Sequence, residues 1–221
     1  MRHFKYILQL FVLITLNSAH AGAYEDFFLA AGNNDAPAVE RLLRRGFDAN
    51  TPGPQGQSAL LTAIRQNAHQ AALVLAKWPE TRVDDRTADD ETPLMLAAFH
   101  NALPLAQALL DRKSDVNKTG WTPLHYAATK AHVEMMRFLL ANHAYIDAPS
   151  PNGTTPLMMA AHYGNPMATK LLLEEGADPR LINHLGLSAL DFAQNGAHAK
   201  ESSVYINAFL SSWHARFPIK P

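Results

Sequence analysis

The chain has 221 residues, of which 48% are hydrophobic and 18% are charged, a composition that excludes a disordered polymer. Nineteen basic against 20 acidic residues give a net charge of −1, so the sequence lacks the basic excess of a nucleic-acid-binding protein. It contains no cysteine, which excludes disulfides, thiolate metal sites and cysteine nucleophiles.

Residues 1–21 predict a secretory signal peptide. Arg2 and Lys5 give a positive start, residues 6–16 form an apolar run, and residues 19–21 (Ala-His-Ala) have the small–x–small pattern of a cleavage site. The run is too short to span a bilayer as a helix, which takes about 20 residues. A membrane anchor or a buried first helix is the alternative interpretation, and residues 21–23 offer a second cleavage site.

Cleavage after Ala21 would place the mature chain outside the cytoplasm, so we expect a periplasmic or secreted protein. A Gram-negative periplasm is favoured, because no sequence after residue 21 predicts a second membrane anchor and no cysteine could carry a lipid. We expect neither a membrane nor a nucleic acid among the partners of the mature chain.

The remaining sequence repeats one motif. T-P-L-x-x-A-A stands at residues 92–98, 122–128 and 155–161, and degenerate copies begin at residues 25, 58 and 188. The six starts are separated by 33, 34, 30, 33 and 33 residues. A second landmark follows about 20 residues after a start, as in G-F-D-A-N at 46–50 and G-A-D-P at 176–179. Regular recurrence of this kind predicts a stack of similar structural units.

The residue types of the motif suit a pair of helices. Its threonine can cap the first helix, and its proline fits the first helical position, where no hydrogen bond is lost. Leucines in the second half of each unit form an apolar stripe for a second helix. Gly46 and Gly176 stand where that helix should end in a left-handed residue, and Lys113 and His143 take this position in two other units.

This period and these motifs closely resemble the ankyrin repeat, over the whole mature chain, residues 22–221. The resemblance implies an all-α ankyrin-repeat solenoid of about six helix-turn-helix units with short β-hairpin fingers, the loops that lead from one unit to the next. The units start near residues 25, 58, 92, 122, 155 and 188, and a capping helix is expected at about 200–216. Such repeats usually recognise other proteins.

Two departures from the pattern predict local changes. The link from Asn117 to Thr122 is three residues shorter than the other links, which predicts a stunted finger. In the second unit, Trp78-Pro79 replaces the usual helix ending, so its second helix should stop near Lys77.

No catalytic motif is present: the sequence lacks G-x-S-x-G, a phosphate-binding glycine loop and H-E-x-x-H. We therefore predict no enzyme activity, no cofactor and no metal. The resemblance implies that His125 braces a turn through hydrogen bonds. His100 and His162 end the first helices of two units, but no ligand spacing supports a metal site. The acidic stretch 84–91 lacks the pattern of a calcium loop and is interpreted as a solvated fingertip.

A repeat stack offers a concave face, and the resemblance implies that fingertips and the ends of the first helices form it. The residues in those positions, taken as partner-binding, are Arg65, Gln66, Glu91, Phe99, His100, Trp121, Thr129, Lys130, Asn152, Thr154, His162 and Tyr163. Aromatic residues gather at the centre of this set, which is typical of interface hot spots. The alternative is that Phe99 and Trp121 pack against neighbouring units.

We predict a non-catalytic periplasmic module that binds a protein partner on this face, as an accessory factor to an exported enzyme. One alternative is an immunity protein that neutralises a toxin delivered to the periplasm. Another is a metal-dependent or histidine-dependent hydrolase.

Overall fold

A computed structural model describes residues 22–54, 56–196 and 198–216, so the predicted signal peptide lies outside the described residues. The chain divides between Thr87 and Ala88 into two compact units, each of which has its own helix pairs. None of the described helices has the length and apolar character needed to cross a membrane.

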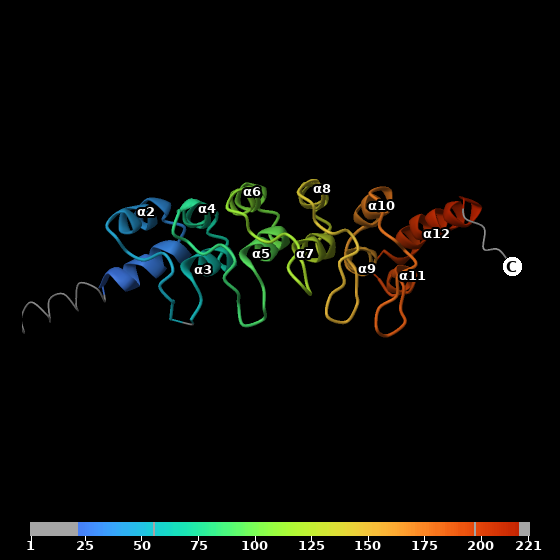
Figure 1. Cartoon of the computed structure of the whole chain (residues 1–221), viewed down its shortest axis with the longest axis horizontal. Coiled ribbons are helices and arrows are strands. Elements are labelled where there is room, and N and C mark those ends of the chain that lie inside the picture. The colour runs from blue at the N-terminus through green and yellow to red at the C-terminus, as the bar shows by residue number, and fades with distance from the viewer. Residues whose placement is uncertain (1–21, 55, 197, 217–221) are drawn as a thin grey trace, which may run out of the picture. The chain divides into compact units, whose positions relative to one another are not determined.

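The first unit contains two helix pairs (Figure 1). A helix over residues 22–32 is followed by α2 (Ala36–Arg44), and α3 (Ala59–Arg65) is followed by α4 (His69–Lys77), which packs against both α2 and α3. As predicted, α4 ends at Lys77, because Trp78 adopts an extended conformation ahead of Pro79.

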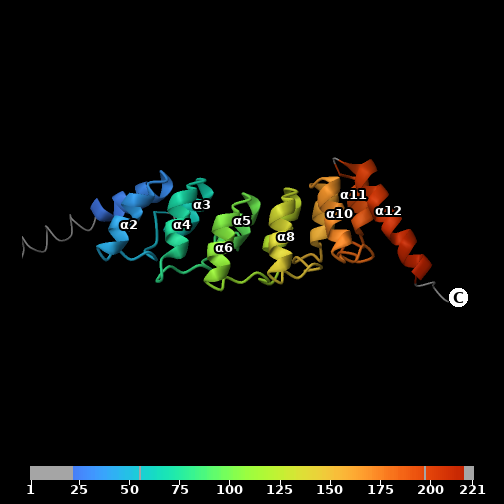
Figure 2. The ribbon, with the colours of Figure 1, turned by 90° about the horizontal axis from the view of Figure 1, so that it is seen from above.

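The second unit contains four further pairs (Figures 1 and 2). They are α5 (Pro93–Phe99) with α6 (Leu103–Asp111), α7 (Pro123–Thr129) with α8 (Val133–Ala141), α9 (Pro156–His162) with α10 (Pro166–Glu174), and α11 (Ala189–Gln194) with α12 (Ala199–Arg216). The first helices of successive pairs pack side by side, α5 on α7, α7 on α9 and α9 on α11. This is the stacked helix-turn-helix arrangement that the repeat predicts.

The helix ends confirm the roles that the motif suggests. The Thr92 hydroxyl accepts a hydrogen bond from the Met95 amide at 3.2 Å, and the Thr155 hydroxyl accepts one from the Met158 amide at 3.4 Å. The residue after the second helix has a positive φ in several units, +100° at Gly176 and +63° at Lys113. Local sequence therefore sets where each helix begins and ends.

Small and aliphatic side chains form the core between the pairs. The motif leucines Leu94, Leu124 and Leu157 are fully buried, and so is the alanine pair of each full motif, within 1%. Gly164 marks a close approach, because a Cβ there would lie 2.8 Å from the carbonyl oxygen of Ala128 in α7. Successive first helices thus pack backbone to backbone.

The fingers of the second unit are short hairpin loops. The Ser150 amide donates to the Thr154 carbonyl at 2.9 Å, and the Asn183 amide donates to the Leu187 carbonyl at 3.0 Å. Residues 182 and 188 form an isolated antiparallel bridge, and no longer strand occurs in the described part of the chain. The loop between α6 and α7 is shorter than the two that follow (Figure 1), as its abridged sequence predicts.

Candidate functional site

The predicted partner-binding residues fall on both units. Arg65 ends α3 and Gln66 is its C-cap, and both are exposed on the first unit. The other ten lie on the second unit, at the ends of α5, α7 and α9 or in the loops before these helices. These ten residues make up the candidate site of the second unit.

Three of the predicted residues line one apolar pocket. Phe99 at the end of α5, Trp121 in the shortened finger and Thr129 at the end of α7 surround a cavity of about 230 Å³. His125, Tyr126 and Met159 complete its walls. The pocket shows that a finger residue and the ends of two neighbouring helices share one face.

The aromatic walls of this pocket contact one another edge to face. The ring centroids of Phe99 and Tyr126 are 6.1 Å apart, and those of Trp121 and His125 are 5.1 Å apart. Both distances lie in the range of favourable aromatic pairs. Phe99 and Trp121 are half-buried, so they both pack against neighbours and reach the surface.

Charged groups lie at the rim of the pocket. The Tyr126 hydroxyl donates to Glu91 Oε1 at 3.1 Å, and Lys130 Nζ lies 4.4 Å from the centroid of the Phe99 ring, a cation–π contact. Burial and the carboxylates of Glu91, Asp89 and Asp90 raise the pKa of Tyr126 well above its ordinary value. Its phenol therefore stays protonated and acts as a hydrogen-bond donor at neutral pH.

His125 lies beneath the pocket and is 1% exposed. Its Nδ1 atom lies 3.2 Å from the Thr122 amide nitrogen and 2.9 Å from the Thr122 hydroxyl, and its Nε2 atom lies 2.9 Å from the Thr154 carbonyl oxygen. Burial lowers the pKa of His125 to about 4, although the hydrogen bond to Thr154 acts in the opposite direction. The ring is neutral at physiological pH and braces the turn, as the resemblance implies.

The remaining histidines on this face also make structural contacts. His162 Nδ1 lies 3.1 Å from the Phe192 carbonyl oxygen, and His132 Nε2 lies 2.9 Å from the Phe99 carbonyl oxygen. His100 packs edge to face against Phe99, with ring centroids 5.3 Å apart. No group of three or more histidines and carboxylates that could hold a metal ion occurs among the described residues.

The predicted residues of the finger before α9 have unequal access to solvent. Asn152 is exposed, and its Oδ1 atom accepts from the Ser150 hydroxyl at 2.6 Å. Thr154 is 1% exposed and contributes its carbonyl oxygen to His125, so its side chain does not reach a partner-facing surface. Tyr163, which follows α9, is 58% exposed.

Sequence reasoning missed an apolar finger between α10 and α11, defined by Leu181, Ile182, Leu185 and Leu187. These side chains are 38–76% exposed, with Leu185 the most exposed. Asn183 holds the loop in shape, since its Oδ1 atom accepts from the Leu185 and Leu187 amides at 2.9 and 3.0 Å. The signal was present in the sequence, because four aliphatic residues stand where an exposed fingertip is expected.

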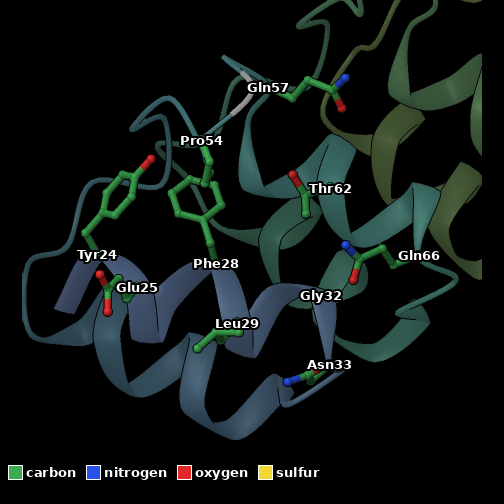
Figure 3. Close-up of a pocket in the computed structure, with 11 residues that line it drawn as sticks. Tyr24, Glu25, Phe28, Leu29, Gly32, Asn33, Pro54, Gln57, Thr62 and Gln66 are labelled. Carbon is green, nitrogen blue, oxygen red and sulfur yellow. The ribbon is translucent and has the colours of Figure 1, made fainter. Parts of the chain in front are cut away.

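A second pocket, of about 430 Å³, lies in the first unit (Figure 3). Tyr24, Phe28 and Leu29 of the first helix line one side, and Pro54 and Gln66 line others. Gly32 lies against the Gln66 side chain, since a Cβ there would lie 2.3 Å from Gln66 Oε1. Of the predicted residues, Gln66 alone contributes to this pocket.

A family model of ankyrin repeats matches the chain in three overlapping segments, residues 27–119, 73–150 and 101–183. The chain belongs to the ankyrin repeat family. Domains of this family are generally non-catalytic modules for protein interaction, which agrees with a face built from packing contacts and exposed apolar side chains.

Several known proteins resemble this ankyrin repeat chain. A putative ankyrin repeat protein of Escherichia coli, YahD, is 29% identical over 195 residues, covering 83% of this chain and 95% of that protein. Notch homolog protein 1 of Xenopus tropicalis is 33% identical over 135 residues, which is 60% of this chain but 5% of the Notch protein.

Solved structures share the fold. An ankyrin repeat domain of Acinetobacter baumannii AYE superposes with a TM-score of 0.72 at 26% identity, covering 83% of this chain and 96% of that one. A chain from the complex of a predatory endopeptidase with an immunity protein of Bdellovibrio bacteriovorus superposes with a TM-score of 0.71 at 24% identity, covering 83% and 97%.

Proposed function

We propose that this ankyrin repeat protein is exported to the periplasm and there holds a protein partner on the face of its second unit. The face consists of the ends of α5, α7 and α9 and the fingers before α7, α9 and α11. The observation that supports it most is the apolar finger, because four exposed aliphatic side chains on one hairpin are costly unless a partner covers them.

The composition of the face suits protein recognition. Tyr163 is 58% exposed beside His162, with ring centroids 4.2 Å apart, and Trp121 and Phe99 stand half-buried around the pocket. Rigid aromatic side chains of this kind dominate interface energies, because they bury much area with little loss of conformational freedom.

The partner we propose is an exported enzyme that the protein stabilises or helps to assemble. A binding role without catalysis is supported by the histidines, since His125, His132 and His162 each have one ring nitrogen in hydrogen-bond contact with a backbone oxygen. A role as an immunity protein is a second candidate, because a chain of similar fold comes from a complex between an endopeptidase and an immunity protein. At 24% identity, this similarity supports a shared fold and does not identify the partner.

Affinity capture from a periplasmic extract, followed by mass spectrometry, tests this function. We expect the unaltered protein to retain a specific protein, and the double variant Tyr163→Ala, Leu185→Ala to retain it at least about tenfold less. Val204→Ala is the matched control, because Val204 is 59% exposed but lies on α12, outside this face. All variants are compared by circular dichroism first.

Equal capture by the double variant and the control would show that the partner uses another surface. The identity of the retained protein separates the two candidates: an endogenous enzyme supports the accessory role, whereas a toxin encoded beside this gene supports immunity. Bound zinc, iron or copper in the purified protein would instead support a metal-dependent hydrolase.

A further inference from the structure

We infer that the pocket formed by Phe99, Trp121, His125, Tyr126, Thr129 and Met159 receives one large apolar side chain of the partner, and that a basic residue stands next to this side chain in the partner. The inference rests on the proposed function and goes beyond it by naming the chemistry of the partner at one point of contact.

The size and lining of the pocket indicate a single apolar side chain. Its volume is about 230 Å³, below the range of roughly 300–1,000 Å³ that encloses drug-sized molecules. The lining is mainly apolar, and Phe99, Trp121, Tyr126 and Met159 contribute to it. A leucine, methionine or phenylalanine side chain would displace water from these mainly apolar walls.

The walls are held in place before a partner arrives. Tyr126 is held by its hydrogen bond to Glu91, and Trp121 packs edge to face against the buried His125 ring. The backbone at Phe99 is held by the hydrogen bond between its carbonyl oxygen and His132 Nε2. A pocket that is already formed loses little conformational freedom on binding, which favours affinity.

Negative charge surrounds one side of the pocket. Asp89, Asp90 and Glu91 are consecutive in the sequence, and the ammonium group of the buried Lys118 pairs with Asp90. A negative potential at the rim attracts a basic residue of the partner and repels an acidic one.

The position of Lys130 directs the partner's charge toward the acidic side. Its ammonium group lies over the Phe99 ring, 4.4 Å from the centroid, so a second cation there would meet like charge. The carboxylate of Glu91 accepts a hydrogen bond at 3.1 Å from the hydroxyl of Tyr126, one of the residues that line the pocket. We therefore expect the basic residue of the partner beside Glu91.

A displayed library of random twelve-residue peptides, selected on the purified protein, tests the inference. We expect enriched peptides to carry leucine, methionine or phenylalanine next to arginine or lysine. In the peptides that bind best, replacing the apolar anchor with alanine should weaken binding at least about tenfold. Replacing the basic residue with glutamine should weaken it about threefold, and high salt should remove that difference.

Variants of the protein test whether the selected peptides bind in the pocket. Thr129→Met fills the cavity with a side chain of the protein and should abolish binding, whereas Gln107→Met, on the exposed surface of α6, should leave it unchanged. Glu91→Gln preserves an acceptor for the Tyr126 hydroxyl but removes the charge, so it should weaken binding about as much as the neutral peptide does. Glu134→Gln, an exposed carboxylate in the first turn of α8, is its control.

Peptides that bind Thr129→Met as tightly as the unaltered protein, or a selection with no preference for an apolar residue, would overturn the assignment of the pocket. Enrichment of acidic neighbours would overturn the charge preference. A periplasmic partner whose capture depends on Tyr163 and Leu185 but not on Thr129 would leave the proposed function standing and still refute this inference.

Discussion

The Nε2 atom of His125 lies 2.9 Å from the carbonyl oxygen of Thr154, which joins the first turn of α7 to the finger before α9. The Nδ1 atom of the same ring meets Thr122 at the start of α7. One buried imidazole thus fixes both a helix start and the loop of the next repeat, and its protonation affects both.

The protein should lose stability as the pH falls from 6.5 to 4. Folding lowers the pKa of His125 from 6.5 to about 4, so the unfolded chain binds more protons within this window. The contribution of His125 is therefore complete above pH 6.5 and decreases by about 3 kcal/mol as the pH approaches 4. Urea unfolding at intervals of half a pH unit measures this slope.

His125→Gln provides the comparison for this pH dependence. The variant will be less stable at every pH, because buried hydrogen bonds are altered, but its stability should change less between pH 6.5 and 4.5. Parallel curves for the two proteins would mean that His125 does not titrate in this range.

Shortening a motif leucine should leave a cavity between helix pairs. Leu124 is fully buried, and we expect Leu124→Ala to reduce the free energy of unfolding by about 2–5 kcal/mol. Leu185→Ala is the same substitution at a side chain that is 76% exposed, so its effect should stay within about 0.5 kcal/mol. Equal effects in thermal unfolding would contradict the assignment of the core.

Glycine-to-alanine substitutions should distinguish stability lost through close packing from stability lost through an unfavourable backbone conformation. A Cβ on Gly164 would lie 2.6 Å from the Ala160 carbonyl oxygen and 2.8 Å from that of Ala128, so Gly164→Ala must push two helices apart, at about 2–3 kcal/mol. Gly176 has open space around it and a φ of +100°, so Gly176→Ala should cost about 1 kcal/mol through the backbone alone. Denaturant titration measures the free energy of unfolding of both variants. A larger loss in Gly176→Ala than in Gly164→Ala would refute the proposed packing.

Export should remove residues 1–21. We expect intact-mass measurement of protein isolated from the periplasm to show a chain that begins at Gly22. Replacing Ala19 and Ala21 with arginine should block cleavage and leave the longer chain attached to the membrane. A full-length chain in the cytoplasmic fraction would disprove both the cleavage and the periplasmic location.

The sequence by itself determined the repeat, the number of helix pairs and the helix ends. These features depend on local interactions, such as the Thr92 hydroxyl capping α5 and the left-handed residue at Gly176. Because such interactions involve neighbours along the chain, spacing alone predicts them. The exposed positions of Arg65, Gln66 and Tyr163 followed from the same periodicity.

The tertiary structure decided which side chains meet and which ones reach solvent. Phe99, Tyr126 and Met159 come from separate repeats, and their meeting around one pocket depends on how neighbouring helices pack. The burial of Thr154 follows from its contact with His125, 29 residues away, which no local pattern reveals. Exposure is a property of the folded surface, because it depends on every neighbour in space, while a repeat motif records neighbours in sequence.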